Sequence, residues 1–243
     1  MAERIDGRAN GDLRRIEGIT DFQTAPEGSV YLKWGQTHVI CSAIVEERVP
    51  KHRLDSGGGW LTAEYNMLPG SGSGRINRSR SRLPGRTAEI QRLIGRSLRA
   101  VVDLDKLPPI TVTVDCDVVN ADGGTRCASI TGAYIALVMA FERYQTTSGL
   151  KLPPIQPLSA VSVGVVDGQV ITDLCYTEDS TAHVDMNVVA TDCGVVEVQG
   201  TGESGPFSRE QLNELIDAGI DACVRIQAFQ HGLLAQWRKT HSV

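Results

Sequence analysis

The chain has 243 residues, of which 41% are hydrophobic and 22% are charged, and its formal net charge is −5. This length suffices for one large domain or two small ones, and the composition is typical of a soluble globular protein. The acidic balance argues against a protein coated in basic surface, and no apolar run reaches the length that a membrane span needs.

Residues 1–8 lack the apolar core of a signal peptide, so we expect a cytoplasmic protein with no membrane partner. The six cysteines are scattered and form no Cys-x-x-Cys pair. Three of them, Cys41, Cys116 and Cys175, stand in apolar, strand-like surroundings. We therefore expect buried free thiols in a reducing compartment, and no zinc site.

The first part of the chain predicts strands followed by a helix. Residues 1–28 are polar and mixed, which is typical of an extended arm with short strands. Residues 29–34 and 37–45 flank a Gly-Gln turn and predict a β-hairpin, and residues 60–65 predict a further short strand. Residues 87–102 carry an apolar stripe at helical spacing, with arginines on another face, and predict a helix.

An alternating run over residues 111–119 predicts a strand that leads into a long apolar helix ending near Gly149. Two hairpins are expected after this helix, the first with an Asp-Gly turn, and Ser208 is placed to cap a last helix. The strands of these hairpins cover residues 160–166, 169–175, 182–191 and 195–199.

This order of elements predicts an α+β protein with mixed or antiparallel β-sheets and helices packed on one face. The stretches of about residues 1–149 and about residues 150–243 each run from strands to a helix, which is typical of a degenerate internal duplication. We expect one domain over residues 1–243 rather than two independent units.

The most informative motif joins the strand to the long apolar helix and reads Asp122-Gly123-Gly124-Thr125-Arg126. A glycine pair lets backbone N–H groups approach an anion, and the start of a helix adds positive potential. With the threonine hydroxyl and the guanidinium, the junction predicts a phosphate or sulfate site. The alternative is a plain helix N-terminus that Asp122 or Thr125 caps. A P-loop is excluded, because it needs a lysine after a longer glycine loop.

Two further sets of residues could act on such an anion. Arg86 stands at the start of the first helix and could clamp the anion from the other side, although by itself it fits pairing with Glu89 better. Asp179 ends one predicted strand and Asp185 lies early in the next, where paired carboxylates would hold a divalent metal or supply a general acid. The alternative for these aspartates is turn chemistry.

Arginine is concentrated in one segment of this acidic chain, and arginine suits bidentate contact with phosphate. The segment indicates a defined polyanion path, and an RNA path, a subunit interface and a solvated loop are its three interpretations. A solvated loop without function fits such closely spaced arginines least well. Besides Arg86, the arginines of this segment are Arg75, Arg78, Arg80, Arg82, Arg92, Arg96 and Arg99.

Taken together, these motifs resemble the ribonuclease PH family of phosphate-dependent 3′ exoribonucleases, and the resemblance runs nearly from end to end. The segments that carry it are residues 57–65 (GGGWLTAEY), 85–96 (GRTAEIQRLIGR), 115–118 (DCDV), 121–126 (ADGGTR), 178–180 (EDS), 185–189 (DMNVV) and 197–201 (EVQGT). The resemblance implies mixed sheets with packed helices, built from two related βαβα-like halves.

The resemblance also implies roles for single residues. Those that would bind inorganic phosphate, the co-substrate, are Arg86, Gly124, Thr125 and Arg126. Asp179 and Asp185 would be the acidic catalytic pair, acting with Mg²⁺ or Mn²⁺. The family assembles as a hexamer, a trimer of dimers, and trims the 3′ ends of tRNA precursors. RNA and further copies of the same chain are therefore the expected partners.

One loop departs from the family pattern. Residues 70–84 read GSGSGRINRSRSRLP, whereas the family usually begins this loop with an arginine and carries an Arg-Glu-Ala…Gly-Lys stretch. The loop lies near subunit contacts and the RNA entrance in relatives. The difference therefore bears on the hexamer contacts and the grip on RNA, and not on phosphate binding.

We therefore expect a phosphorolytic 3′-5′ exoribonuclease, a nucleotidyltransferase that trims tRNA precursors and other RNA, releases nucleoside diphosphates and also runs in reverse. Whether Asp185 protonates the leaving oxygen or binds a metal stays open. One competing class is a non-catalytic RNA-binding ring subunit, which would be expected to lack the arginine set or the acidic pair. The other is a phosphorylase of small metabolites, which would not need an arginine-rich path.

Overall fold

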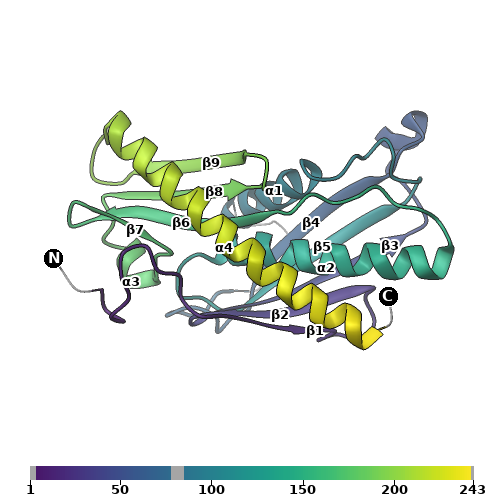
Figure 1. Ribbon diagram of the computed structural model, residues 1–243, viewed down its shortest axis with the longest axis horizontal. Helices are drawn as coiled ribbons and strands as arrows, with labels where there is room; N and C mark the ends of the chain where they lie inside the picture. The colour runs from purple at the N-terminus through teal and green to yellow at the C-terminus, as the bar shows by residue number, and fades with distance from the viewer. Residues whose placement is uncertain (1–3, 78–84, 242–243) are drawn as a thin grey trace.

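The computed structural model describes residues 4–77 and 85–241, and it contains two β-sheets with helices packed between and beside them (Figure 1). The first sheet has the strand order β1-β2-β3-β5-β4, and its strands are antiparallel except for the parallel pair β4 and β5. Its strands are β1 (Ile16–Thr20), β2 (Gly28–Trp34), β3 (Thr37–Glu46), β4 (Trp60–Met67) and β5 (Thr111–Asn120).

The second sheet is antiparallel throughout and has the order β7-β6-β8-β9. Its strands are β6 (Ser159–Val166), β7 (Gln169–Thr172), β8 (Val184–Ala190) and β9 (Val195–Gly202). The helices are η1 (Lys51–Ser56, a 3₁₀ helix), α1 (Gly85–Arg99), α2 (Thr125–Ser148), α3 (Tyr176–Asp179) and α4 (Arg209–His241). Among the residues that the structure describes, no helix combines the length and the apolar character needed to cross a membrane.

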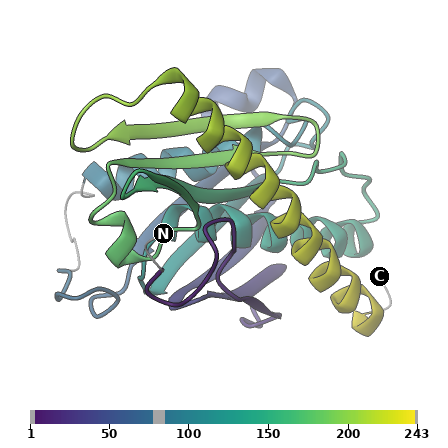
Figure 2. The same cartoon turned by 60° about the vertical axis from the view of Figure 1, so that its left-hand side comes forward.

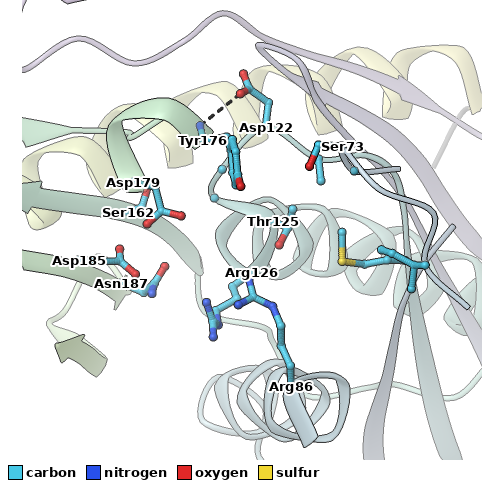
Figure 3. Close-up of a pocket in the computed structure, with 16 residues that line it drawn as sticks. Ser73, Arg86, Asp122, Thr125, Arg126, Ser162, Tyr176, Asp179, Asp185 and Asn187 are labelled. Atoms are coloured by element: carbon cyan, nitrogen blue, oxygen red, sulfur yellow. Dashed lines mark hydrogen bonds between the residues drawn. The ribbon is translucent and has the colours of Figure 1, made fainter. Parts of the chain in front are cut away.

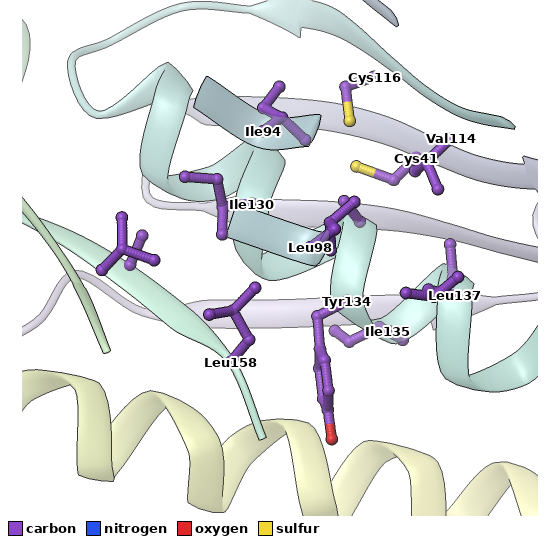
Figure 4. Close-up of a cluster of buried hydrophobic side chains, with 14 of the residues drawn as sticks. Cys41, Ile94, Leu98, Val114, Cys116, Ile130, Tyr134, Ile135, Leu137 and Leu158 are labelled. Atoms are coloured by element: carbon purple, nitrogen blue, oxygen red, sulfur yellow. The ribbon is translucent and has the colours of Figure 1, made fainter. Parts of the chain in front are cut away.

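Helices α1 and α2 cover one face of the first sheet, α1 against β4 and α2 against β2, β3 and β5. The thiols of Cys41 and Cys116, paired across β3 and β5, both point at the Ser129 carbonyl of α2 at 3.7 Å. The core cluster that forms here includes side chains from both halves of the chain, among them Ile94 of α1 and Leu158 (Figure 4). Because α2 lies inside this core, it is apolar on nearly all sides.

Two successive residues of β8 show that the second sheet lies between helices. Asn187 accepts a hydrogen bond from the Cys127 thiol of α2 at 3.1 Å. The next residue, Val188, faces α4, since a Cβ atom added at Gly219 would stand 2.6 Å from its side chain. Successive strand residues point to opposite faces. The layers are therefore sheet, α1 and α2, sheet, and α4, which runs diagonally across the outer face of the second sheet (Figure 2).

The expectation of helices on one face is thus correct for the first sheet, whereas the second sheet has helices on both faces. The physical reason is visible in β6, which is buried along nearly its whole length, as a strand covered on both faces is. In such a strand, polar and apolar residues do not alternate, so the sequence does not indicate a side that faces solvent.

The hairpins form where the sequence predicts them, but the strand expected over residues 169–175 ends at Thr172. Asp173 follows with a left-handed φ of 58°, and the chain then makes the single turn of α3. Asp179 therefore ends a short helix rather than a strand, which corrects its predicted placement. Asp185 lies near the start of β8 as expected. The helix expected over residues 87–102 begins at Gly85 and ends at Arg99.

Candidate functional site

The N-terminus of α2 is open. Gly124 is its N-cap residue with φ 66°, and Gly123 before it has φ 73°. In the part of the chain that the structure describes, no side chain forms a capping hydrogen bond at this end of the helix. The alternative in which Asp122 or Thr125 caps the helix is therefore wrong. Since the first-turn N–H groups of a helix have no intrahelical partners, an uncapped end is suited to bind an anion.

The loop before α2 is held from below by Thr37, the first residue of β3. The Thr37 hydroxyl donates to the Gly123 carbonyl at 2.7 Å and accepts the Asp122 N–H at 2.9 Å. The Asp122 carboxylate in turn accepts the backbone N–H of Tyr176, in α3, at 3.2 Å (Figure 3). The glycine loop is thus tied to the first sheet and to α3 before any ligand is present.

A cavity of about 480 Å³ opens in front of this loop. It is lined by Arg86 of α1, Arg126 of α2, Asp179 of α3 and Asp185 of β8, together with Gly124 and Thr125. The two guanidiniums lie next to each other, and the two carboxylates lie across the cavity from them (Figure 3). The structure therefore brings together all six residues that the sequence assigns to phosphate binding and to the acidic pair.

Glu89 orients Arg126 toward the cavity. Its carboxylate accepts a hydrogen bond from Arg126 Nη2 at 3.0 Å and another from Gln199 Nε2 at 3.0 Å. Although burial acts to raise the pKa of Glu89, these bonds and the nearby positive charges lower it, so Glu89 is ionised. The Nε atom of Arg126 is buried and has no hydrogen-bond partner among residues 4–77 and 85–241. A buried donor without a partner is costly unless a ligand satisfies it, which fits an anion at this position.

Among the described residues, Glu89 forms its ion pair with Arg126, while the charge of Arg86 also acts to lower the pKa of Glu89. Arg86 is exposed, and its charge acts on the pKa values of Asp179 and Asp185 across the cavity.

Tyr65 supports the anion site indirectly, through a hydrogen bond to Thr125. Its side chain is 2% exposed, and its hydroxyl donates to Thr125 Oγ1 at 3.1 Å. Since the Thr125 oxygen accepts this bond, the hydrogen of the Thr125 hydroxyl is available to donate to a ligand. From the sequence alone, Tyr65 is predicted to be a core residue, because nothing in the sequence indicates which group its hydroxyl would bond.

The pKa values of both carboxylates of the cavity are raised. Burial first, and then the neighbouring charge of Asp179, raise the pKa of Asp185 to about 6, whereas Arg126 and Arg86 act to lower it. Burial also raises the pKa of Asp179. Glu203, which the sequence analysis did not single out, adds negative charge beside both. A carboxyl with a pKa near neutrality can act as a general acid.

The acidic pair also suits a divalent cation. Within residues 4–77 and 85–241, no group of three or more His, Cys, Asp or Glu side chains is arranged to hold a metal by itself. Mg²⁺, however, commonly binds through one or two carboxylates together with substrate phosphates and water. The donor set of Asp179 and Asp185 beside a phosphate site fits that pattern.

The arginines of the basic segment have different surroundings. Arg96 forms an ion pair with Glu197 of β9, with a 2.6 Å bond from its Nε, and Arg99 stacks 5.0 Å over the Trp60 ring. Arg92 and Arg75 are exposed. Arg78, Arg80 and Arg82 lie outside the described residues. A role of this set in RNA binding or subunit contact stays a prediction.

Two kinds of comparison identify relatives. The sequence models of the 3′ exoribonuclease family match residues 12–141 (domain 1) and 156–222 (domain 2). The chain is 52% identical to a protein named ribonuclease PH of Nocardia farcinica, over 97% of this chain and 93% of the relative. It is 55% identical to ribonuclease PH of Bacillus cereus, over 92% of this chain and 95% of the relative.

Solved structures with the same fold are more distant in sequence. Rrp46 of rice (Oryza sativa) superimposes with a TM-score of 0.77 at 21% identity, covering 95% of this chain and 100% of that one. A chain of the Archaeoglobus fulgidus exosome with RNA bound to the active site also gives 0.77 at 21% identity, covering 93% and 92%. These two likenesses show the fold.

The raised pKa of Asp185 predicts a measurable effect on stability in metal-free, phosphate-free protein. Because the folded-state pKa of about 6 lies above the unfolded value, ionisation of Asp185 costs folding free energy as the pH rises through this window. Asp185→Asn removes this cost. Relative to wild type, its free energy of unfolding should rise by roughly 1–3 kcal/mol between about pH 4 and about pH 8.

The measurement is urea unfolding at both pH values in the presence of a chelator. Asp192→Asn, at an exposed position in the turn between β8 and β9, serves as the control and should follow wild type. A variant at Asp185 that shows no gain relative to wild type as the pH rises would contradict the assignment of a buried, charge-repelled carboxyl.

Proposed function

Because the chain belongs to the 3′ exoribonuclease family, we propose that it is a phosphorolytic 3′-5′ exoribonuclease that uses the cavity at the start of α2. Orthophosphate attacks the 3′-terminal phosphodiester of RNA, and the products are a nucleoside diphosphate and an RNA that is one residue shorter. One observation carries this proposal. Arg86 and Arg126, from two different helices, line the same cavity as the uncapped end of α2, and the acidic pair lines its other wall.

Each phosphate-binding residue has a distinct task. The N–H groups at Gly124 and Thr125 and the Thr125 hydroxyl donate to the phosphate oxygens, and the potential of the helix N-terminus favours the negative charge. Arg126, held by Glu89, supplies its unpartnered Nε, and Arg86 closes the site from α1. Guanidiniums are suited to this task because they offer several donors in a rigid plane.

The chemistry needs alignment and charge neutralisation more than a strong base. The attacking phosphate is already an anion, and the target phosphorus carries anionic oxygens, so the two groups repel each other in solution. The two arginines and the dipole of α2 reduce this repulsion, and they hold the attacking oxygen in line with the bond to be broken. A new P–O bond forms to the terminal phosphorus, and the bond to the 3′ oxygen of the preceding nucleotide breaks.

The leaving 3′ oxygen must take up a proton or be stabilised by a cation. Two roles fit Asp185: its carboxyl, with a pKa near 6, can donate the proton, or with Asp179 it can hold a metal ion. Mg²⁺ or Mn²⁺ held by Asp179 and Asp185 would stabilise the charge on the leaving oxygen. Since the phosphoanhydride formed stores much of the energy of the bond broken, the reverse addition of nucleotides from diphosphates also runs.

The substrates that we propose are tRNA precursors and other RNAs with a single-stranded 3′ end. The exposed Arg75 and Arg92, with the arginines outside the described residues, would hold the strand by its phosphates, with an affinity that falls as salt rises. All six cysteines are free, and four are buried, which supports a reducing compartment and hence the cytoplasm.

The phosphate dependence of the products tests the function. Wild type incubated with a tailed RNA should release nucleoside diphosphates only when orthophosphate is present. Arg126→Ala should lower this release by about 100-fold or more, because it removes a charged donor from the transition state, while the fold is kept. Chromatography of the released nucleotides measures both.

Arg48→Ala, which removes an exposed arginine paired with Glu46, is the matched control and should retain wild-type release. Monophosphate products would indicate hydrolysis instead, and no released nucleotide in wild type would indicate a binding protein. Full activity of Arg126→Ala would defeat the assignment of the phosphate site.

Asp185→Asn should separate chemistry from binding. The amide can neither donate the proton nor carry the charge that binds a metal, so turnover should fall by about 100-fold or more. The affinity for tailed RNA, measured by fluorescence anisotropy, should stay close to that of wild type, because the RNA is held by arginines elsewhere. Turnover that stays within about three-fold of wild type would exclude Asp185 from catalysis.

We further propose that the chain assembles as a hexamer built as a trimer of dimers. The support is its family membership, and the altered loop at residues 70–84 makes the test informative. The mass in solution, measured by light scattering, should be six times the chain mass of 26.2 kDa. A mass of two chains would show that the loop does not support the full ring.

A further inference from the structure

A buried ion pair lies directly behind the candidate site. Asp173, which is 1% exposed, comes immediately after β7 and just before α3. Its carboxylate accepts the Arg14 backbone N–H at 2.6 Å, Arg14 Nη2 at 2.7 Å and the Trp34 indole N–H at 2.8 Å. A buried charge needs such a set of donors, and here two of them come from one arginine.

The same arginine reaches the phosphate loop. Arg14 Nη1 donates to the Asp122 carbonyl at 2.5 Å, and Nη2 lies 3.1 Å from the point where a Cβ at Gly124 would stand. Arg14 is itself 6% exposed. One planar guanidinium therefore touches both the segment that leads into α3 and the loop that starts α2.

The two segments that Arg14 joins are in direct backbone contact. A Cβ atom added at Gly123 would stand 2.6 Å from the Leu174 carbonyl oxygen and 2.8 Å from the Tyr176 nitrogen. No side chain could fit between them, so a small shift of one segment moves the other. The Asp122 carboxylate bonded to the Tyr176 N–H is the second link (Figure 3).

Upstream of Arg14, the N-terminal arm makes further charged contacts on the α3 side. Arg4, which is buried, donates from Nε and Nη2 to the Glu178 carboxylate at 2.7 and 2.8 Å, and to the Asp173 carbonyl at 3.0 Å. Glu178 is the neighbour of Asp179 and accepts the Cys175 N–H at 2.9 Å. Arg4 thus holds the helix that presents Asp179, and Arg14 adds a charged link between the segment before that helix and the anion site.

We propose that Arg14 and Asp173 are positioning residues for the reaction: their buried pair fixes the separation between the phosphate loop and the catalytic carboxylate of α3. This inference rests on the proposed phosphorolytic function. The physical reason is that in-line attack requires the phosphate and the acidic group each to lie within a fraction of an ångström of its reactive position. A misplacement by about 1 Å can lower the rate by about 100-fold.

The residue types fit this task. Only the planar fork of arginine can donate from separate nitrogens to Asp122 and to Asp173 at once, whereas lysine would supply one point charge. Aspartate and asparagine are among the few residues that tolerate a left-handed backbone, so Asp173→Asn keeps the φ of 58° while removing the charge. The conservative changes Arg14→Lys and Asp173→Asn therefore test the positioning role while they alter side-chain packing little.

Arg14→Lys is the primary test, with phosphate varied at saturating tailed RNA. The phosphate KM should rise and kcat should fall, each by about tenfold or more, while the Kd for RNA stays within about two-fold. A purely structural role would only reduce the fraction of active protein. It would therefore lower kcat without changing the phosphate KM.

Arg15→Lys is the matched control, since the neighbouring arginine is on the surface and pairs with Glu17. It should leave all three constants unchanged. A folded Arg14→Lys protein whose phosphate KM stays within about two-fold of wild type would overturn the inference. Absence of phosphate-dependent release in wild type would instead overturn the proposed function itself, so the two failures are distinguishable.

If Arg14→Lys fails to fold, Asp173→Asn is measured in the same way and judged by the same change in phosphate KM. A further measurement needs no variant: hydrogen exchange of the wild type with and without orthophosphate. Phosphate should slow exchange in residues 173–179 as well as in residues 122–126. Protection confined to residues 122–126 would show that the two segments are not coupled.

Discussion

The open N-terminus of α2 is the constraint around which the candidate site is arranged. Gly123 and Gly124 both adopt left-handed φ values, and Gly123 has no room for a Cβ against the backbone of the segment before α3. The helix behind them packs in the core between the two sheets, and the N–H groups of its first turn have no partners within the helix. An anion is the natural partner for donors fixed in this way.

The charges around this end are balanced before a ligand arrives. Arg126 is paired with Glu89, which itself accepts a hydrogen bond from Gln199. The guanidinium is therefore already oriented before an anion binds, and binding restricts its motion little further. Across the cavity, burial and the charge of Asp179 raise the pKa of Asp185 to about 6. The result is a positive wall and an acidic wall that face each other, which suits a reaction in which an anion attacks a phosphodiester and a proton or cation must meet the leaving oxygen.

Local patterns predicted most of the elements correctly. The hairpin around Asp167 and Gly168 forms because both residues adopt the positive φ values that its turn requires, and Ser208 does cap α4 through a bond from the Gln211 N–H. The expected strand over residues 169–175 is too long. Its alternation continues past Thr172, but Asp173 turns aside because its carboxylate is bound by Arg14, which lies 159 positions earlier.

By itself, the sequence determined the glycine pair at a helix start, the arginine and aspartate types, and the resemblance to a family of phosphorolytic exoribonucleases, because these depend on neighbours in the chain or on motif order. Only the tertiary structure decided which guanidinium Glu89 binds, that Tyr65 supports Thr125, and that Arg14 and Asp173 join the two sides of the site. Those contacts cross between elements far apart in the chain. Their partners are chosen by how the two sheets pack on α2, and no local spacing encodes that choice.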